Sequence, residues 1–189
     1  MMFRSAGHKT LRARVWEVVL TVAMMRLCVW VAISILKALG LAAQVDLSHT
    51  PFLGVSTNYL LPGFNFDPAQ GLTSPWVILG LLIAIVGAPH MEEIVFRWFV
   101  CRSLASDDSG NLISTPEGKG LGIVLFGSFI VFGILHGQGY FSLAIQGVGG
   151  LFLARLWFRN GPGLKAAYFS CVAAHSFYNA SVAIQEWIA

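Results

Sequence analysis

Charged residues are scarce in this chain. Only 11% of its 189 residues are Asp, Glu, Lys or Arg, whereas 56% are hydrophobic, and the mean hydropathy is +0.71. Soluble domains carry about 25% charged residues, so this composition predicts an integral membrane protein. The basic residues do not cluster with aromatic residues on one amphipathic stretch, which argues against nucleic-acid binding. The length fits a single integral membrane domain over residues 1–189.

Cysteine is also rare. Cys28, Cys101 and Cys171 are an odd number of widely spaced residues, and no CxxC motif occurs. This pattern argues against a disulfide framework and against a thiolate zinc site. A cysteine protease mechanism through Cys171 and a serine mechanism through Ser128 stay open as alternatives.

Two other protease signatures are missing. The chain contains no HExxH motif, so a zincin fits poorly. An aspartyl intramembrane protease needs two aspartates inside the membrane. All four aspartates of this chain lie between its apolar stretches: Asp46, Asp67, Asp107 and Asp108.

Long apolar stretches are abundant. A transmembrane helix needs about 20 mainly apolar residues. The five candidate stretches are Trp16–Leu39, Pro75–Val100, Leu121–His136, Tyr140–Phe158 and Leu164–Trp187. They predict an all-α, polytopic transmembrane helical bundle with about five spans. A sixth arises if the second stretch breaks at Gly87-Ala88-Pro89, because proline removes a backbone hydrogen bond, or if residues 42–74 contain a re-entrant piece.

The distribution of Lys and Arg predicts the orientation. Residues 42–74 contain neither residue, whereas the segments before the first span, between the second and third, and between the fourth and fifth are basic. Basic loops stay on the cytoplasmic side, so we expect a cytoplasmic N-terminus. The first stretch follows basic residues as a signal peptide would, but it is too long and contains Arg26, so we expect a retained anchor.

Titratable residues stand out within the apolar stretches. A charged side chain near the bilayer centre costs about 2.5–3.5 kcal/mol on insertion scales, so such residues either pair to hold helices together or carry out chemistry. Three short motifs are of interest. One contains Glu92, Glu93 and Arg97, and the other two pair a histidine with a residue four positions away: Phe132 with His136, and His175 with Asn179.

The paired glutamates predict a division of roles. Glu93 and Arg97 are four residues apart with the acid first, the favourable order for an ion pair on one helix. Glu92 lies about 100° away around the helix. We therefore expect Arg97 to neutralise Glu93, which leaves Glu92 free to act as a general base toward water.

The two histidines complete a set of groups suited to peptide hydrolysis. His175 and Asn179 share one helical face and can donate hydrogen bonds to an oxyanion. His136 can pair with Glu92 to activate water. The predicted depths of these residues in the membrane do not agree. From the nearest predicted cytoplasmic loop, Glu92 and His175 lie about 15–16 Å deep at helical rise, whereas His136 lies about 25 Å deep.

The spacing EExxxR, FxxxH and HxxxN, each within an apolar stretch, resembles the CPBP family of intramembrane proteases. This family includes the type II CAAX prenyl proteases and the bacterial Abi or bacteriocin-processing proteins. The resemblance covers about residues 75–189. It implies that Glu92 and His136 activate water, that His175 and Asn179 form the oxyanion site, and that the remaining motif residues support them: Glu93, Arg97 and Phe132.

The resemblance implies a metal-free glutamate mechanism with no cofactor. The residues alone leave a zinc ion open, because Glu92, His136 and His175 are a known type of catalytic zinc set. The implied substrate is a membrane-anchored or lipid-modified peptide or proprotein, reached within the lipid bilayer. The small size favours a prokaryotic inner or plasma membrane. A non-proteolytic bacteriocin self-immunity or peptide-binding protein is the alternative function.

Overall fold

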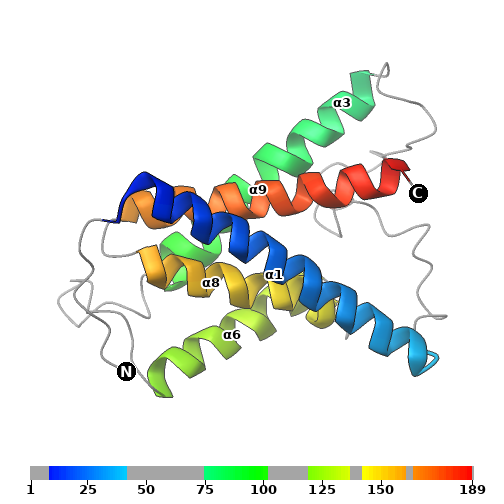
Figure 1. Cartoon of the computed structure of the whole chain (residues 1–189), viewed down its shortest axis with the longest axis horizontal. Helices are drawn as coiled ribbons and strands as arrows, with labels where there is room; N and C mark the ends of the chain where they lie inside the picture. Colours follow the sequence, from blue (N-terminus) through cyan, green and yellow to red (C-terminus); the bar gives the residue numbers. More distant parts are fainter. Residues whose placement is uncertain (1–8, 42–74, 102–118, 137–141, 161–163, 189) are drawn as a thin grey trace.

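The computed structural model describes residues 9–41, 75–101, 119–136, 142–160 and 164–188. Every regular element within these ranges is helical, and the elements join into five helical runs (Figure 1). The elements are α1 (Leu11–Ala38), α3 (Pro75–Leu82), η4 (Ile83–Gly87), α4 (Ala88–Glu93), η5 (Ile94–Cys101), α6 (Lys119–Leu135), η6 (Leu143–Gly147), α8 (Val148–Asn160) and α9 (Leu164–Ile188).

The predicted all-helical bundle is confirmed. The largest difference at a helix start is in α1, which begins at Leu11 and not at Trp16. Within the described ranges, two helices are long and apolar enough to cross a membrane: Leu11–Ala38 and Val77–Cys101. The predictions for residues 42–74 lie outside the described residues.

Local signals set both ends of α1. The Thr10 hydroxyl accepts a hydrogen bond from the first turn of the helix, as an N-cap residue does. At the other end Gly40 has φ 69°, a conformation that favours glycine. The Gly40 N–H donates to Lys37 O and the Leu41 N–H to Leu36 O, which is a Schellman ending.

The run that carries the glutamates stays helical past its proline. This run, called the acidic run below, consists of α3, η4, α4 and η5. Its η segments are π-helical. Pro89 lies in the first turn of α4, directly after η4, and the chain stays helical on both sides of it. The run therefore does not break at Gly87-Ala88-Pro89, and the described residues form five helical runs.

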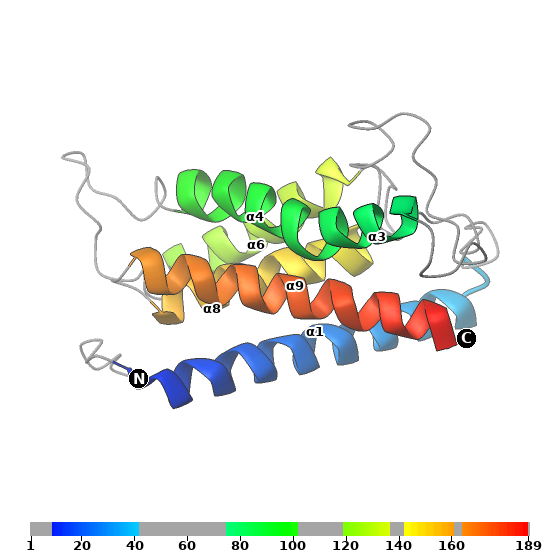
Figure 2. The ribbon, with the colours of Figure 1, turned by 90° about the horizontal axis from the view of Figure 1, so that it is seen from above.

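Helix α9 lies in the middle of the bundle, with α1 on one side and the α3–α4 run on the other (Figure 2). Successive runs alternate in direction, so α1 and α9 begin at the same end (Figure 1). Basic residues gather at that end, where Glu17 accepts from Lys9 at 2.6 Å and from Arg159 at 3.1 Å. Because α9 lies beside the α3–α4 run, it can present side chains to the acidic run.

Helices α6 and α8 touch through their backbones. A Cβ atom on Gly150 would lie 2.6 Å from Phe132 Cβ and 2.8 Å from Ser128 O. Such distances are shorter than real Cβ contacts, so only glycine allows this approach. The contact brings the face of α6 that carries Phe132 and His136 against the rest of the bundle.

We expect Gly150→Ala to push α6 away from α8 and to destabilise the fold by about 1–3 kcal/mol, the usual cost of overpacking. Thermal unfolding of the detergent-solubilised protein would measure the change. Gly122→Ala is the matched control on α6, because a Cβ there meets no atom within 4 Å. Equal melting temperatures for the two variants would contradict the proposed close contact.

Candidate active site

Glu93 and Arg97 form a fully buried ion pair. Arg97 Nε lies 3.0 Å from Glu93 Oε2, and neither side chain has any exposed surface. Arg97 Nη1 also donates to Ser128 Oγ at 2.9 Å, and Ser128 Oγ donates in turn to Gly150 O at 3.0 Å. The guanidinium thus connects the acidic run to α6, and through Ser128 to α8.

Glu93 has a second partner that the spacing of the motifs did not predict. His175 Nδ1 lies 3.0 Å from Glu93 Oε1, in a buried contact between α9 and α4. Because a carboxylate accepts, this contact places a hydrogen on His175 Nδ1 and directs Nε2 elsewhere. Glu93 therefore orients His175 as well as neutralising Arg97.

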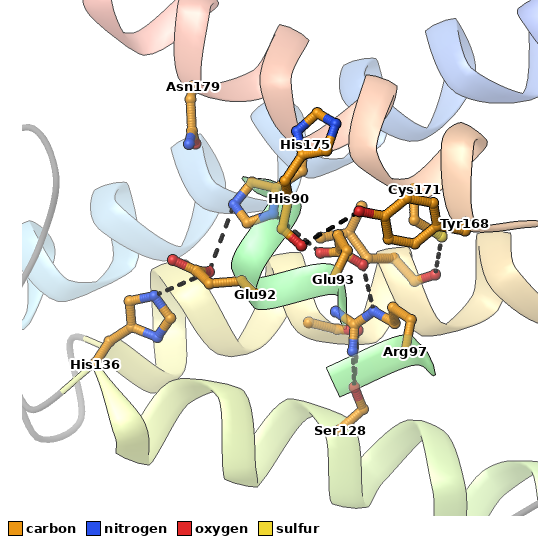
Figure 3. Close-up of polar contacts among 12 residues, drawn as sticks. His90, Glu92, Glu93, Arg97, Ser128, His136, Tyr168, Cys171, His175 and Asn179 are labelled. Carbon is orange, nitrogen blue, oxygen red and sulfur yellow. Dashed lines mark hydrogen bonds and ion pairs between the residues drawn. The ribbon is translucent and has the colours of Figure 1, made fainter. Parts of the chain in front are cut away.

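Glu92 lies between the two histidines (Figure 3). Its Oε2 atom is 3.6 Å from His136 Nε2 and 3.8 Å from His175 Nε2. The side chain of Glu92 keeps 18% of its surface exposed, whereas that of Glu93 keeps none. The two adjacent glutamates thus have different surroundings, as their angular separation predicted.

The tautomer of His136 follows from its backbone contact. His136 Nδ1 lies 2.6 Å from Phe132 O. A carbonyl oxygen only accepts, so Nδ1 carries the hydrogen and Nε2 points at Glu92. Both imidazoles therefore direct the same ring nitrogen at one carboxylate oxygen.

Phe132 packs at the centre of this group. Its ring centroid lies 4.7 Å from that of His136, 6.0 Å from that of His175 and 4.8 Å from that of Phe96. Arg97 Cζ lies 5.3 Å from the same ring, within cation–π range. The phenyl ring thus packs against both imidazoles and against the guanidinium of Arg97.

Asn179 reaches the acidic run at a different level. Its Nδ2 atom donates to Ala84 O at 2.8 Å. One of its two amide hydrogens is thereby engaged, and one is left for another acceptor. Asn179 therefore has one N–H left for its predicted role as a hydrogen-bond donor to an oxyanion.

The structure brings His136 to the level of Glu92 in spite of the depth expected from the sequence. Helix α6 crosses the bundle obliquely (Figure 1), so its length overstates how deep its last residue lies. The depth expected from the sequence treated the helices as parallel, and the oblique course of α6 accounts for the difference.

The alternative nucleophiles are engaged elsewhere. The Ser128 hydroxyl donates to Gly150 O and accepts from Arg97. The Cys171 thiol is fully buried and donates to Leu153 O at 3.3 Å. Among the residues that the structure describes, no group of three or more His, Cys, Asp or Glu side chains is arranged to hold a metal ion.

A family model described as type II CAAX prenyl endopeptidase, Rce1-like, matches residues 74–181. The chain belongs to this Rce1-like family. The match contains the whole described group from Glu92 to Asn179. No curated protein and no solved structure matches the chain. Membership makes it a CAAX-type protease of the membrane, with a membrane-associated protein as substrate.

In this Rce1-like protein we expect Glu93→Gln to cost about 3–5 kcal/mol, because it leaves the buried Arg97 charge without its partner. Arg97→Gln should cost a similar amount. The double variant should lose less than the sum of the two, since no unpaired charge is left. Chemical unfolding in detergent measures all three. Strictly additive losses would show that the pair is not coupled.

Proposed function

We propose that this protein is an intramembrane endopeptidase in which Glu92 activates the hydrolytic water. The observation that carries the proposal is the convergence of His136 Nε2 and His175 Nε2 on Glu92 Oε2, at 3.6 and 3.8 Å. Both distances exceed a direct hydrogen bond. A bridging water fits separations of this size.

The tautomers favour a water at this position. With the hydrogen of His136 on Nδ1, a neutral imidazole and a carboxylate present two acceptors to each other. A water that donates one hydrogen to Glu92 and the other to His136 satisfies both acceptors. Its lone pair is then left to attack a carbonyl carbon.

The hydrolysis balances with these residues alone. Glu92 accepts a proton from the water as the new carbon–oxygen bond forms. The oxyanion of the tetrahedral intermediate accepts hydrogen bonds from His175 Nε2 and from the remaining Asn179 N–H. The carbon–nitrogen bond then breaks, and the proton held by Glu92 passes to the leaving nitrogen.

The charges in the site suit this assignment. Glu92 and Glu93 are two acids, and Arg97 is one base that is always protonated. One protonated imidazole makes the group neutral, as buried charges require. Because Glu93 already accepts from His175, we assign that proton to His175, where Nε2–H can donate to the oxyanion.

The substrate in this proposal is a membrane-anchored or lipid-modified peptide or proprotein. Glu92 lies within a helix that is long and apolar enough to cross a membrane, so a substrate must reach it within the bilayer. The basic residues at the shared start of α1 and α9 favour a cytoplasmic N-terminus. The prokaryotic origin stays a prediction from size.

We expect Glu92→Gln to lower the turnover of a membrane-anchored peptide library at least about a thousandfold, because the amide cannot take a proton from water. Substrate binding should be retained. Glu17→Gln is the matched control, since Glu17 pairs with Lys9 and Arg159 at the end of the bundle and should leave turnover nearly unchanged.

Each reaction is run with and without a strong chelator. Cleavage that ignores the chelator but needs Glu92 supports the proposed mechanism. Cleavage that the chelator stops would replace it with a metal held by Glu92, His136 and His175. Peptide binding without any cleavage, in the wild type and the variant alike, would favour the immunity function instead.

A further inference from the structure

The backbone of the acidic run leaves one carbonyl without its helical donor. In η4 the Ala88 N–H donates to Ile83 O, five residues earlier, as in a π-helix. The next bond in this pattern would run from residue 89 to Ala84 O. Residue 89 is Pro89, which has no N–H, so the π-helical pattern cannot supply a donor to Ala84 O.

This carbonyl lies deep in the protein. Ala84 has no exposed surface, and no water competes within a bilayer core. An unpaired backbone carbonyl in such a place is strongly unfavourable. A donor from outside the run is therefore needed.

Asn179 supplies that donor from α9. Its Nδ2 atom lies 2.8 Å from Ala84 O. The assignment of nitrogen to this end of the amide follows from chemistry, because the amide oxygen cannot donate to a carbonyl. The side chain of Asn179 thus takes the place of the missing backbone N–H of Pro89.

The bond joins α9 to the acidic run at a second level. The first junction is the contact of His175 with Glu93, one helical turn before Asn179 on α9. In the acidic run, Glu92 lies between the two junction residues Ala84 and Glu93. The position of Glu92 relative to His175 is therefore held from both sides.

We propose that Asn179 is a positioning residue that replaces the backbone donor missing at Pro89 and so fixes the acidic run against α9. The carboxamide holds the run with one N–H, and the second N–H is the one left for substrate. The bearing of this bond on catalysis rests on the proposed function, whereas its bearing on stability does not.

The test is a double-variant cycle of Asn179→Leu and Pro89→Ala in the full chain. Leucine branches at Cγ as asparagine does but has no donor, and Pro89→Ala returns a backbone N–H to the run. We expect Asn179→Leu to lower the melting temperature in detergent by about 3–10 °C in the wild-type background. In the Pro89→Ala background, Asn179→Leu should lower the melting temperature by less than half as much.

Two controls accompany the cycle. Pro75→Ala changes a proline at the start of α3, so its combination with Asn179→Leu should give additive shifts. Ser181→Ala removes a hydroxyl that donates within α9, to Tyr178 O, and should behave alike in both proline backgrounds. If Asn179→Leu lowers the melting temperature equally in the wild-type and the Pro89→Ala backgrounds, the proposal is overturned. A variant that fails to fold in both backgrounds would overturn it as well.

Activity provides a readout that a general loss of stability would not move. At a temperature where all variants are folded, Asn179→Leu should lower kcat about tenfold or more with KM nearly unchanged. Pro89→Ala should restore part of kcat, and Pro75→Ala none. Glu92→Gln in the same assay tests the proposed function separately. If it retains turnover, that function fails, while the melting temperatures still decide the role of Asn179.

Discussion

Two opposite charges, on Glu93 and Arg97, lie with no exposed surface inside a bundle of apolar helices. Removing either charge from water is expensive, and each is tolerable only beside the other. The pair then recruits further partners: His175 to the carboxylate and Ser128 to the guanidinium. Because these residues come from α9 and α6, the requirement to satisfy one ion pair determines how three helical runs meet.

The same constraint separates the roles of the adjacent glutamates. Glu93 is occupied by a guanidinium and an imidazole, so its oxygens are not available to a substrate. Glu92 keeps part of its surface exposed and faces two imidazole nitrogens at distances that leave room for a water. A structural carboxylate and the carboxylate that we propose to be reactive thus come from neighbouring positions that differ in orientation by about 100°.

Close approach of backbones places the remaining groups. Gly150 lets α6 and α8 touch, which holds Phe132 and Ser128 against the acidic run. Near the proline, the π-helical turn leaves Ala84 O to Asn179. These contacts depend on the absence of an atom, a Cβ in one case and an N–H in the other. In the sequence Pro89 predicted only a possible break of the helix, and that interpretation did not point to the site.

The sequence by itself determined the helical runs, the Glu93–Arg97 pair and the list of candidate reactive residues. Each of these follows from local properties: apolar length, the spacing of four residues along one helix, and the types of side chain inside the spans. Tertiary structure alone decided that His175 bonds to Glu93, that Ser128 holds Arg97, and that His136 reaches the level of Glu92. These contacts depend on the oblique crossing of α6 and on which helix faces which. Such angles arise from packing between segments far apart in the chain, and no local pattern encodes them.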